Sequence, residues 1–204
     1  MRRYSPLIDA LARYLAQPLK RPGSSSNSDP HSLSALLVPG DVLLTDGNSR
    51  MAALVRRVTR SPWSHVAMYV GPLEDGADPR CIVEADIAGG VRAVRLSELE
   101  GLRVRVLRPR GLDDTLRRRL ADWVVSRIGG QYDLAHAWAL AKRLLRLPLP
   151  SRLPQAAHSA TRFICSTLLA QAFLLVGHPV VADPACVTPR DFETASVFEP
   201  ISTS

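Results

Sequence analysis

The chain has 204 residues, of which 46% are hydrophobic, so it can bury a core within a single domain. Its formal net charge is +7, carried largely by arginine, and no stretch approaches the roughly 18 consecutive apolar residues of a membrane span. Aromatic residues make up only 5%, and no helix-turn-helix, RNA-recognition or zinc-finger pattern is present. We therefore do not expect a nucleic-acid partner.

The N-terminal region predicts an appendage to the globular domain. Apolar residues at helical spacing predict an amphipathic helix within residues 1–21, and a stretch rich in serine and proline predicts a flexible linker over residues 22–32. Asp9, Arg13 and Gln17 interrupt any apolar signal-peptide core, so we expect a cytoplasmic protein. The basic helix would suit docking on the domain, on a partner chain or peripherally on an anionic membrane.

The domain, residues 33–204, begins with strand patterns. A turn leads into a strand within residues 38–44, a short amphipathic helix covers residues 51–58, and a strand surrounds His65. Further strands are predicted at residues 81–86, 91–95 and 102–107. In the last, arginines alternate with apolar residues, which predicts a sheet with one solvent-exposed face.

The second half is helical. Asp113 or Asp114 is expected to cap a helix whose apolar stripe ends at Ile128, and a second helix is expected at about residues 133–147. A third runs from Cys165 to a C-terminal cap at Gly177. The tail, residues 178–204, contains four prolines and little periodicity. Strands followed by helices predict an α+β fold.

Cys165 and His65 are the residues that carry chemistry. The helix dipole at the start of the Cys165 helix favours the thiolate, and a histidine beside the sulfur would complete a nucleophile–base pair. Strand alternation places His65 and Tyr69 on one face, and Glu84 on the next strand could orient the imidazole. The alternatives are a structural histidine and a solvated Glu84.

Four segments also resemble a known family. They recur in this order in the YiiX/YebB-like hydrolases, circularly permuted relatives of the NlpC-type papain-fold cysteine peptidases. The resemblance covers about residues 38–195. The segments are Gly40–Leu44, Ser64–Gly71, Val83–Ala85 and Phe163–Ser166.

The resemblance implies a permuted papain-like fold of the α+β class, with a small antiparallel sheet, partly rolled into a barrel, against the cysteine helix. It implies Cys165 as nucleophile, His65 as base and Glu84 as the residue that orients His65. Residues 129–133 resemble a Gly-x-x-Tyr segment that would bring Tyr132 to the substrate, and we expect Tyr69 to line the same pocket. The residues around Cys165 differ from the Asp-Cys-Ser-Gly form of peptidoglycan-cleaving relatives, which argues against that specificity.

The predicted activity is hydrolysis of an amide or ester bond through a thioester on Cys165. Three cysteines without CxxC spacing argue against a disulfide framework, and no histidine has ligand spacing with another, so we expect neither metal nor cofactor. The alternatives are an acyltransferase similar to lecithin:retinol acyltransferase and a catalytically silent binding module. The sequence leaves open the oligomeric state and whether the acyl substrate is a small molecule, a peptide or lipid-like.

Overall fold

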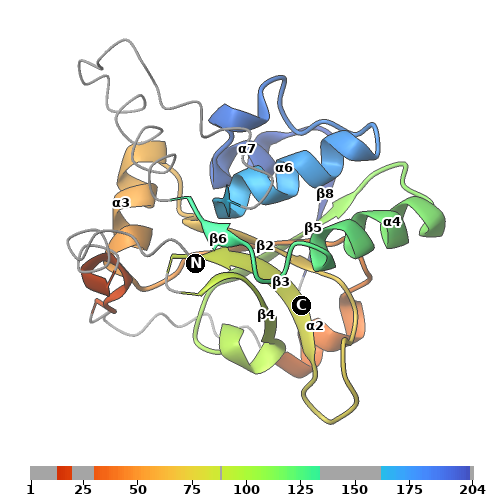
Figure 1. Cartoon of the computed structure of the whole chain (residues 1–204), viewed down its shortest axis with the longest axis horizontal. Coiled ribbons are helices and arrows are strands. Elements are labelled where there is room, and N and C mark those ends of the chain that lie inside the picture. Colours follow the sequence, from red (N-terminus) through yellow and green to blue (C-terminus); the bar gives the residue numbers. More distant parts are fainter. Residues whose placement is uncertain (1–12, 20–29, 88, 134–161, 203–204) are drawn as a thin grey trace.

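The computed structural model describes residues 13–19, 30–87, 89–133 and 162–202 (Figure 1). Its centre is a six-stranded sheet with strand order β4-β3-β2-β1-β5-β8, in which every neighbouring pair is antiparallel. The strands are β1 (Val42–Thr45), β2 (His65–Tyr69), β3 (Arg80–Asp86), β4 (Gly90–Arg95), β5 (Val104–Pro109) and β8 (Phe198–Ile201).

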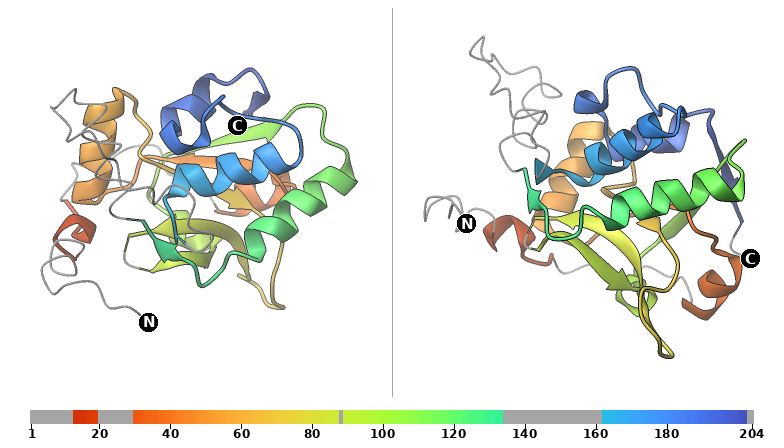
Figure 2. Two further views of the ribbon diagram at one scale, coloured as in Figure 1. Left: turned by 45° about the horizontal axis from the view of Figure 1, so that its top comes forward. Right: turned by 45° about the vertical axis from the view of Figure 1, so that its right-hand side comes forward.

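Helices lie on both faces of this sheet (Figures 1 and 2). One face packs against α4 and α6, and the other against α2 and the short η1 helix. A separate parallel pair, β6 (Gln131–Tyr132) and β7 (Arg162–Phe163), leads into α6. The helices are α2 (Pro30–Leu36), α3 (Arg50–Thr59), η1 (Leu96–Leu99), α4 (Asp114–Val125), α6 (Cys165–Leu175), η3 (Pro184–Cys186) and α7 (Pro189–Thr194).

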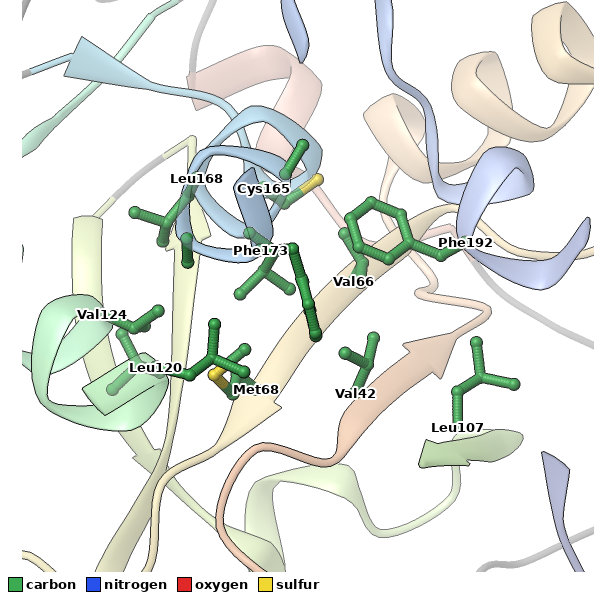
Figure 3. Packing of buried hydrophobic residues seen from close by; sticks show 14 of the residues in the cluster. Val42, Val66, Met68, Leu107, Leu120, Val124, Cys165, Leu168, Phe173 and Phe192 are labelled. Atoms are coloured by element: carbon green, nitrogen blue, oxygen red, sulfur yellow. The ribbon is translucent and has the colours of Figure 1, made fainter. Parts of the chain in front are cut away.

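Strand alternation divides the buried side chains between these two layers. Val66 and Met68 on β2 point toward α6, as Figure 3 shows, whereas Ala67 between them lies in the layer under α2 and η1. The prediction of one solvent-exposed sheet face holds only at the start of β5, where Arg103 and Arg105 are 42% and 45% exposed and Val106 is buried. Over β1 and β2 both faces are buried, and the second face packs against Leu33 of α2, a helix that begins at Pro30 inside the predicted linker.

The two long helices of the second half follow their predicted boundaries closely. Asp113 Oδ1 accepts a hydrogen bond of 2.8 Å from the Leu116 N–H, which confirms the N-terminal cap of α4. That helix ends at Val125, so Ile128 lies beyond it and is exposed. Gly177, with φ +76°, terminates α6, and the His178 N–H donates to the Phe173 carbonyl oxygen at 2.9 Å.

The proline-rich tail has more structure than its sequence pattern indicates. It forms α7 and then β8, which pairs with β5 and completes the sheet. The Phe198 ring packs edge-on against Phe173 of α6, with 5.1 Å between ring centroids. The tail is therefore part of the domain core.

The described part of the N-terminal region, residues 13–19, docks on the start of α3. The Leu19 N–H donates to Asn48 at 2.7 Å, and the Arg50 guanidinium lies 4.4 Å above the centre of the Tyr14 ring. The rest of the predicted N-terminal helix and most of the predicted linker lie outside the described residues, as does all but residue 133 of the helix predicted at about residues 133–147. Among the described helices, none is both long and apolar enough to cross a bilayer.

Candidate active site

Cys165 is the first residue of α6 and lies at the edge of the packed core in Figure 3. The preceding turn is held by Thr167, whose Oγ1 accepts a hydrogen bond of 3.1 Å from the Ile164 N–H. As a first-turn residue, Cys165 has a backbone N–H without an acceptor inside the helix. Its residue surface is 8% exposed, so the thiol lies at the boundary of the core. The positive end of the helix dipole is centred on this position.

His65 begins β2, and Glu84 lies on the neighbouring strand β3. The distance from His65 Nε2 to Glu84 Oε2 is 2.8 Å, and the two side chains are 23% and 11% exposed. Since Glu84 occupies Nε2, the ring nitrogen that remains for the Cys165 sulfur is Nδ1. The Cys165 side chain also forms a hydrogen bond with His65, so the three residues expected to form the catalytic group lie together.

The charges around His65 favour its protonated form. Burial lowers the pKa of His65, but the charges of Cys165 and Glu84, and side-chain hydrogen bonds to both, outweigh burial and raise that pKa well above 6.5. For Glu84, burial raises the pKa, and its interactions with His65 and then Arg92 lower it below 4.5 overall. The arrangement is thus suited to an imidazolium held between the Glu84 carboxylate and the Cys165 sulfur.

Arg92 completes the surroundings of Glu84 and is absent from the sequence-based site. Its Nη2 lies 2.8 Å from Glu84 Oε1, and the β3–β4 register places the two residues directly opposite each other. Sequence alone shows an arginine in a strand with apolar neighbours. Only the strand register indicates that this arginine faces the carboxylate of the site.

Tyr132 approaches Cys165 through the small parallel pair. It is aligned with Phe163, two residues before Cys165. Burial raises the pKa of Tyr132 well above 10, and the charges of Cys165, Asp86 and Asp133 raise it further. The phenol therefore stays neutral and can donate a hydrogen bond near the sulfur.

Tyr69 is not brought to this group. It lies at the opposite end of β2 from His65 and packs against the second core layer, with Ala67. Burial raises the pKa of Tyr69, and the charges of Cys81 and Asp41 raise it further. Its neighbours are therefore those of the α2 side of the sheet.

The other two cysteines have different surroundings. Cys81 is buried in the second layer, where burial raises the pKa of its thiol to about 11. The Cys186 thiol donates a hydrogen bond of 3.2 Å to Asp183 Oδ2. Within the described ranges, no three His, Cys, Asp or Glu side chains are grouped so that they could hold a metal ion.

Comparison with protein families gives a match over residues 37–144, more than half of the chain. The matching model is that of the permuted papain-like amidase enzymes, YaeF/YiiX, C92 family. The matched range contains His65 and Glu84 and ends before Cys165. No curated protein matches the sequence significantly.

Among solved structures, the chain is similar to one described as the crystal structure of metalloprotein yiiX from Escherichia coli O157:H7. The TM-score is 0.58 at 18% sequence identity, over 80% of this chain and 96% of that one. At this identity the likeness concerns the fold alone. Together with the family match, it confirms the permuted papain-like fold expected from the order of the motifs, with histidine before cysteine.

Proposed function

This chain belongs to the family of permuted papain-like amidases, enzymes of the cysteine hydrolase class, and on that premise we propose that it cleaves an amide or ester bond through a thioester on Cys165. The observation that supports the proposal most directly is the position of His65. Its ring interacts with the Cys165 side chain and with the Glu84 carboxylate. A nucleophile, a base and an orienting carboxylate in this order are the parts that thiol-dependent acyl transfer requires.

In the first half-reaction, the Cys165 sulfur attacks the substrate carbonyl carbon while His65 holds the proton from the thiol. A carbon–sulfur bond forms, and the carbonyl electron pair moves onto oxygen. When that oxyanion collapses, the bond to the leaving nitrogen or oxygen breaks, and the His65 imidazolium gives its proton to the leaving atom. The product is a thioester on Cys165.

In the second half-reaction, water attacks the thioester. His65 takes a proton from that water, the oxygen bonds to the acyl carbon, and the carboxylic acid leaves as the sulfur recovers its electron pair. Glu84 keeps the ring directed at the sulfur throughout because its carboxylate binds the other nitrogen. The backbone N–H of Cys165, which has no acceptor inside its own helix, and the neutral Tyr132 hydroxyl are the donors that we assign to the oxyanion. Tyr69 has no part in this proposal.

Replacement of the nucleophile or the base tests the assignment. We expect Cys165→Ala and His65→Ala each to lower kcat by about four orders of magnitude or more, since neither thioester formation nor proton transfer can then proceed. Cys186→Ala is the matched control and should keep activity. The assay is a panel of acyl-amide, acyl-ester and lipid substrates. Full turnover by Cys165→Ala would rule the proposal out.

Product analysis distinguishes hydrolysis from acyl transfer, because both pass through the same thioester. We expect free acid as the main product when an amine or alcohol acceptor is present. Predominant transfer to the acceptor would instead identify an acyltransferase of the lecithin:retinol acyltransferase type, with the same Cys165 and His65.

A further inference from the structure

The Glu84 carboxylate is held from two sides. Its Oε2 lies 2.8 Å from His65 Nε2, and its Oε1 lies 2.8 Å from Arg92 Nη2. The Glu84 side chain is only 11% exposed, so water cannot fully replace either partner. A carboxylate this far from solvent stays ionised only when it is paired, which makes the arginine as important to its charge as the histidine.

Arg92 is itself fixed in place. It lies directly across from Glu84 in the β3–β4 register, and it approaches the carboxylates of Glu98 at 3.3 Å and Asp86 at 3.8 Å. Its aliphatic stem crosses the turn before β4, where a Cβ on Gly89 would lie 2.9 Å from Arg92 Cδ. A glycine at position 89 therefore leaves the room that this side-chain course needs.

We propose that Arg92 is a positioning residue of the active site, which acts through Glu84 by holding its carboxylate ionised and directed at the His65 ring. The proposal rests on the function proposed above for Cys165 and His65. Arg92 does not touch the reacting sulfur. It fixes one carboxylate oxygen so that the other remains available to the imidazole, and this in turn keeps Nδ1 facing Cys165.

The effect of removing Arg92 has a definite sign. The Arg92 charge is among the causes that lower the pKa of Glu84, so its loss raises that pKa. Glu84 is then protonated at a higher pH and no longer stabilises an imidazolium. Among the described residues, the charged and titratable groups around this pair include His65 on β2, Asp86 on β3, Glu98 on η1, Tyr132 on β6 with Asp133 beside it, and Cys165 on α6.

The test is the rate at which iodoacetamide alkylates Cys165 as a function of pH, followed by peptide mass spectrometry. We expect Arg92→Ala to slow alkylation near neutral pH about tenfold or more, similar to the loss seen when the outer partners that orient metal-binding histidines are removed. The pH at which reactivity is lost on acidification should also rise. Arg92→Lys keeps the charge and should restore most of both properties.

Arg95→Ala is the matched control. Arg95 lies on the same strand, is 45% exposed against 42% for Arg92, and pairs with Glu74 rather than Glu84. We expect a wild-type pH profile for this variant. Gly89→Ala displaces the Arg92 stem without removing its charge, so it should slow alkylation less than Arg92→Ala. It should also leave the acid limb of the profile, the pH range in which reactivity is lost on acidification, where it is in wild type.

An unchanged rate and acid limb in Arg92→Ala would overturn the proposal, as would an equal change in Arg95→Ala. Neither result affects the assignment of Cys165 as nucleophile and His65 as base, which fails if Cys165→Ala or His65→Ala still turns substrate over. A merely structural role for Arg92 would lower thermal stability without moving the acid limb, and this outcome also contradicts the proposal. If Arg92→Ala does not fold, the other two variants decide. A wild-type pH profile of alkylation in Gly89→Ala, together with a defective profile in Arg92→Lys, would contradict the proposal.

Discussion

At the scale of single residues, the character of the site is set by competition between burial and pairing. Burial alone would leave His65 neutral and Glu84 protonated. Their mutual hydrogen bond of 2.8 Å, with Cys165 on one side and Arg92 on the other, reverses both tendencies. The result is a row of alternating charges on His65, Glu84 and Arg92, in which the Glu84 carboxylate stabilises the cations on both sides.

Glu84→Gln tests this balance. The charge of Glu84 and its hydrogen bond both raise the pKa of His65, so His65 should titrate at a lower pH in the variant than in wild type. The measurement is the pH dependence of the imidazole NMR signals, with His65 assigned by comparison with His65→Ala. Glu98→Gln removes a nearby carboxylate that pairs with Arg92 rather than His65 and should leave the titration nearly unchanged. An unaltered His65 titration in Glu84→Gln would contradict the expectation.

The same linkage has a consequence for folding. Because the pKa of His65 is raised in the folded protein, this pairing stabilises the fold fully below pH 6.5, and the contribution is lost as pH rises through the folded pKa. Glu84 behaves oppositely. Its lowered pKa stabilises the fold above pH 4.5, and that contribution is lost as pH falls through the folded value.

At the scale of secondary-structure elements, the approach of β6 to β4 positions Tyr132. The Val91 N–H donates to the Gly130 carbonyl oxygen at 2.8 Å. A Cβ at Gly90 would lie 2.2 Å from that same oxygen, which is closer than any real contact. The absence of a side chain at residue 90 is therefore a requirement for this packing.

Gly90→Ala should be clearly more destabilising than Gly101→Ala. Both glycines have positive φ, +69° and +76°, so both variants incur left-handed strain of about 1–2 kcal/mol. Only residue 90 adds a collision, since a Cβ at Gly101 meets nothing within 4 Å. We expect a further loss of about 1–3 kcal/mol for Gly90→Ala in urea unfolding. Equal losses for the two variants would show that β4 and β6 do not pack this closely.

At the scale of the whole molecule, α6 joins the active site to the core. The helix is buried along most of its length, and Phe173 lies at the centre of the layer that also contains β2 and the tail. Phe198 contacts the Phe173 ring edge-on, and Phe192 of α7 lies 5.8 Å from Phe198 between ring centroids. The proline-rich tail is thus held by the helix that carries Cys165.

Phe173→Ala should lower the free energy of unfolding by about 3–5 kcal/mol, because it leaves a cavity beneath the sheet and removes the support of Phe198. Leu174→Ala, at the next residue, is the control. Its side chain is 51% exposed, so the expected change is within about 0.5 kcal/mol. Denaturant unfolding measures both, and a small loss for Phe173→Ala would contradict a single core shared by α6 and the tail.

Elements whose signals are local are predicted correctly. An apolar run between Cys165 and Gly177 predicts α6 with the thiol at its N-terminus, and Asp113 or Asp114 predicts the start of α4, which Asp113 caps. These predictions hold because helix caps, turns and hydrophobic periodicity act over a few neighbouring residues. The permuted fold was implied by the resemblance to the YiiX/YebB-like hydrolases, in which the histidine strand likewise precedes the cysteine helix.

Contacts between distant segments depend on the tertiary packing. The parallel pairing that brings Tyr132 toward Cys165 and the addition of β8 to the sheet both join segments far apart in the chain. Burial of the second sheet face by α2 is of the same kind. Arg92 lies close to Glu84 in sequence, and its place opposite that carboxylate follows from the register of the β3–β4 hairpin. Such contacts depend on how whole layers pack and on the hydrogen bonds that each strand edge must satisfy. Local sequence patterns predict neither.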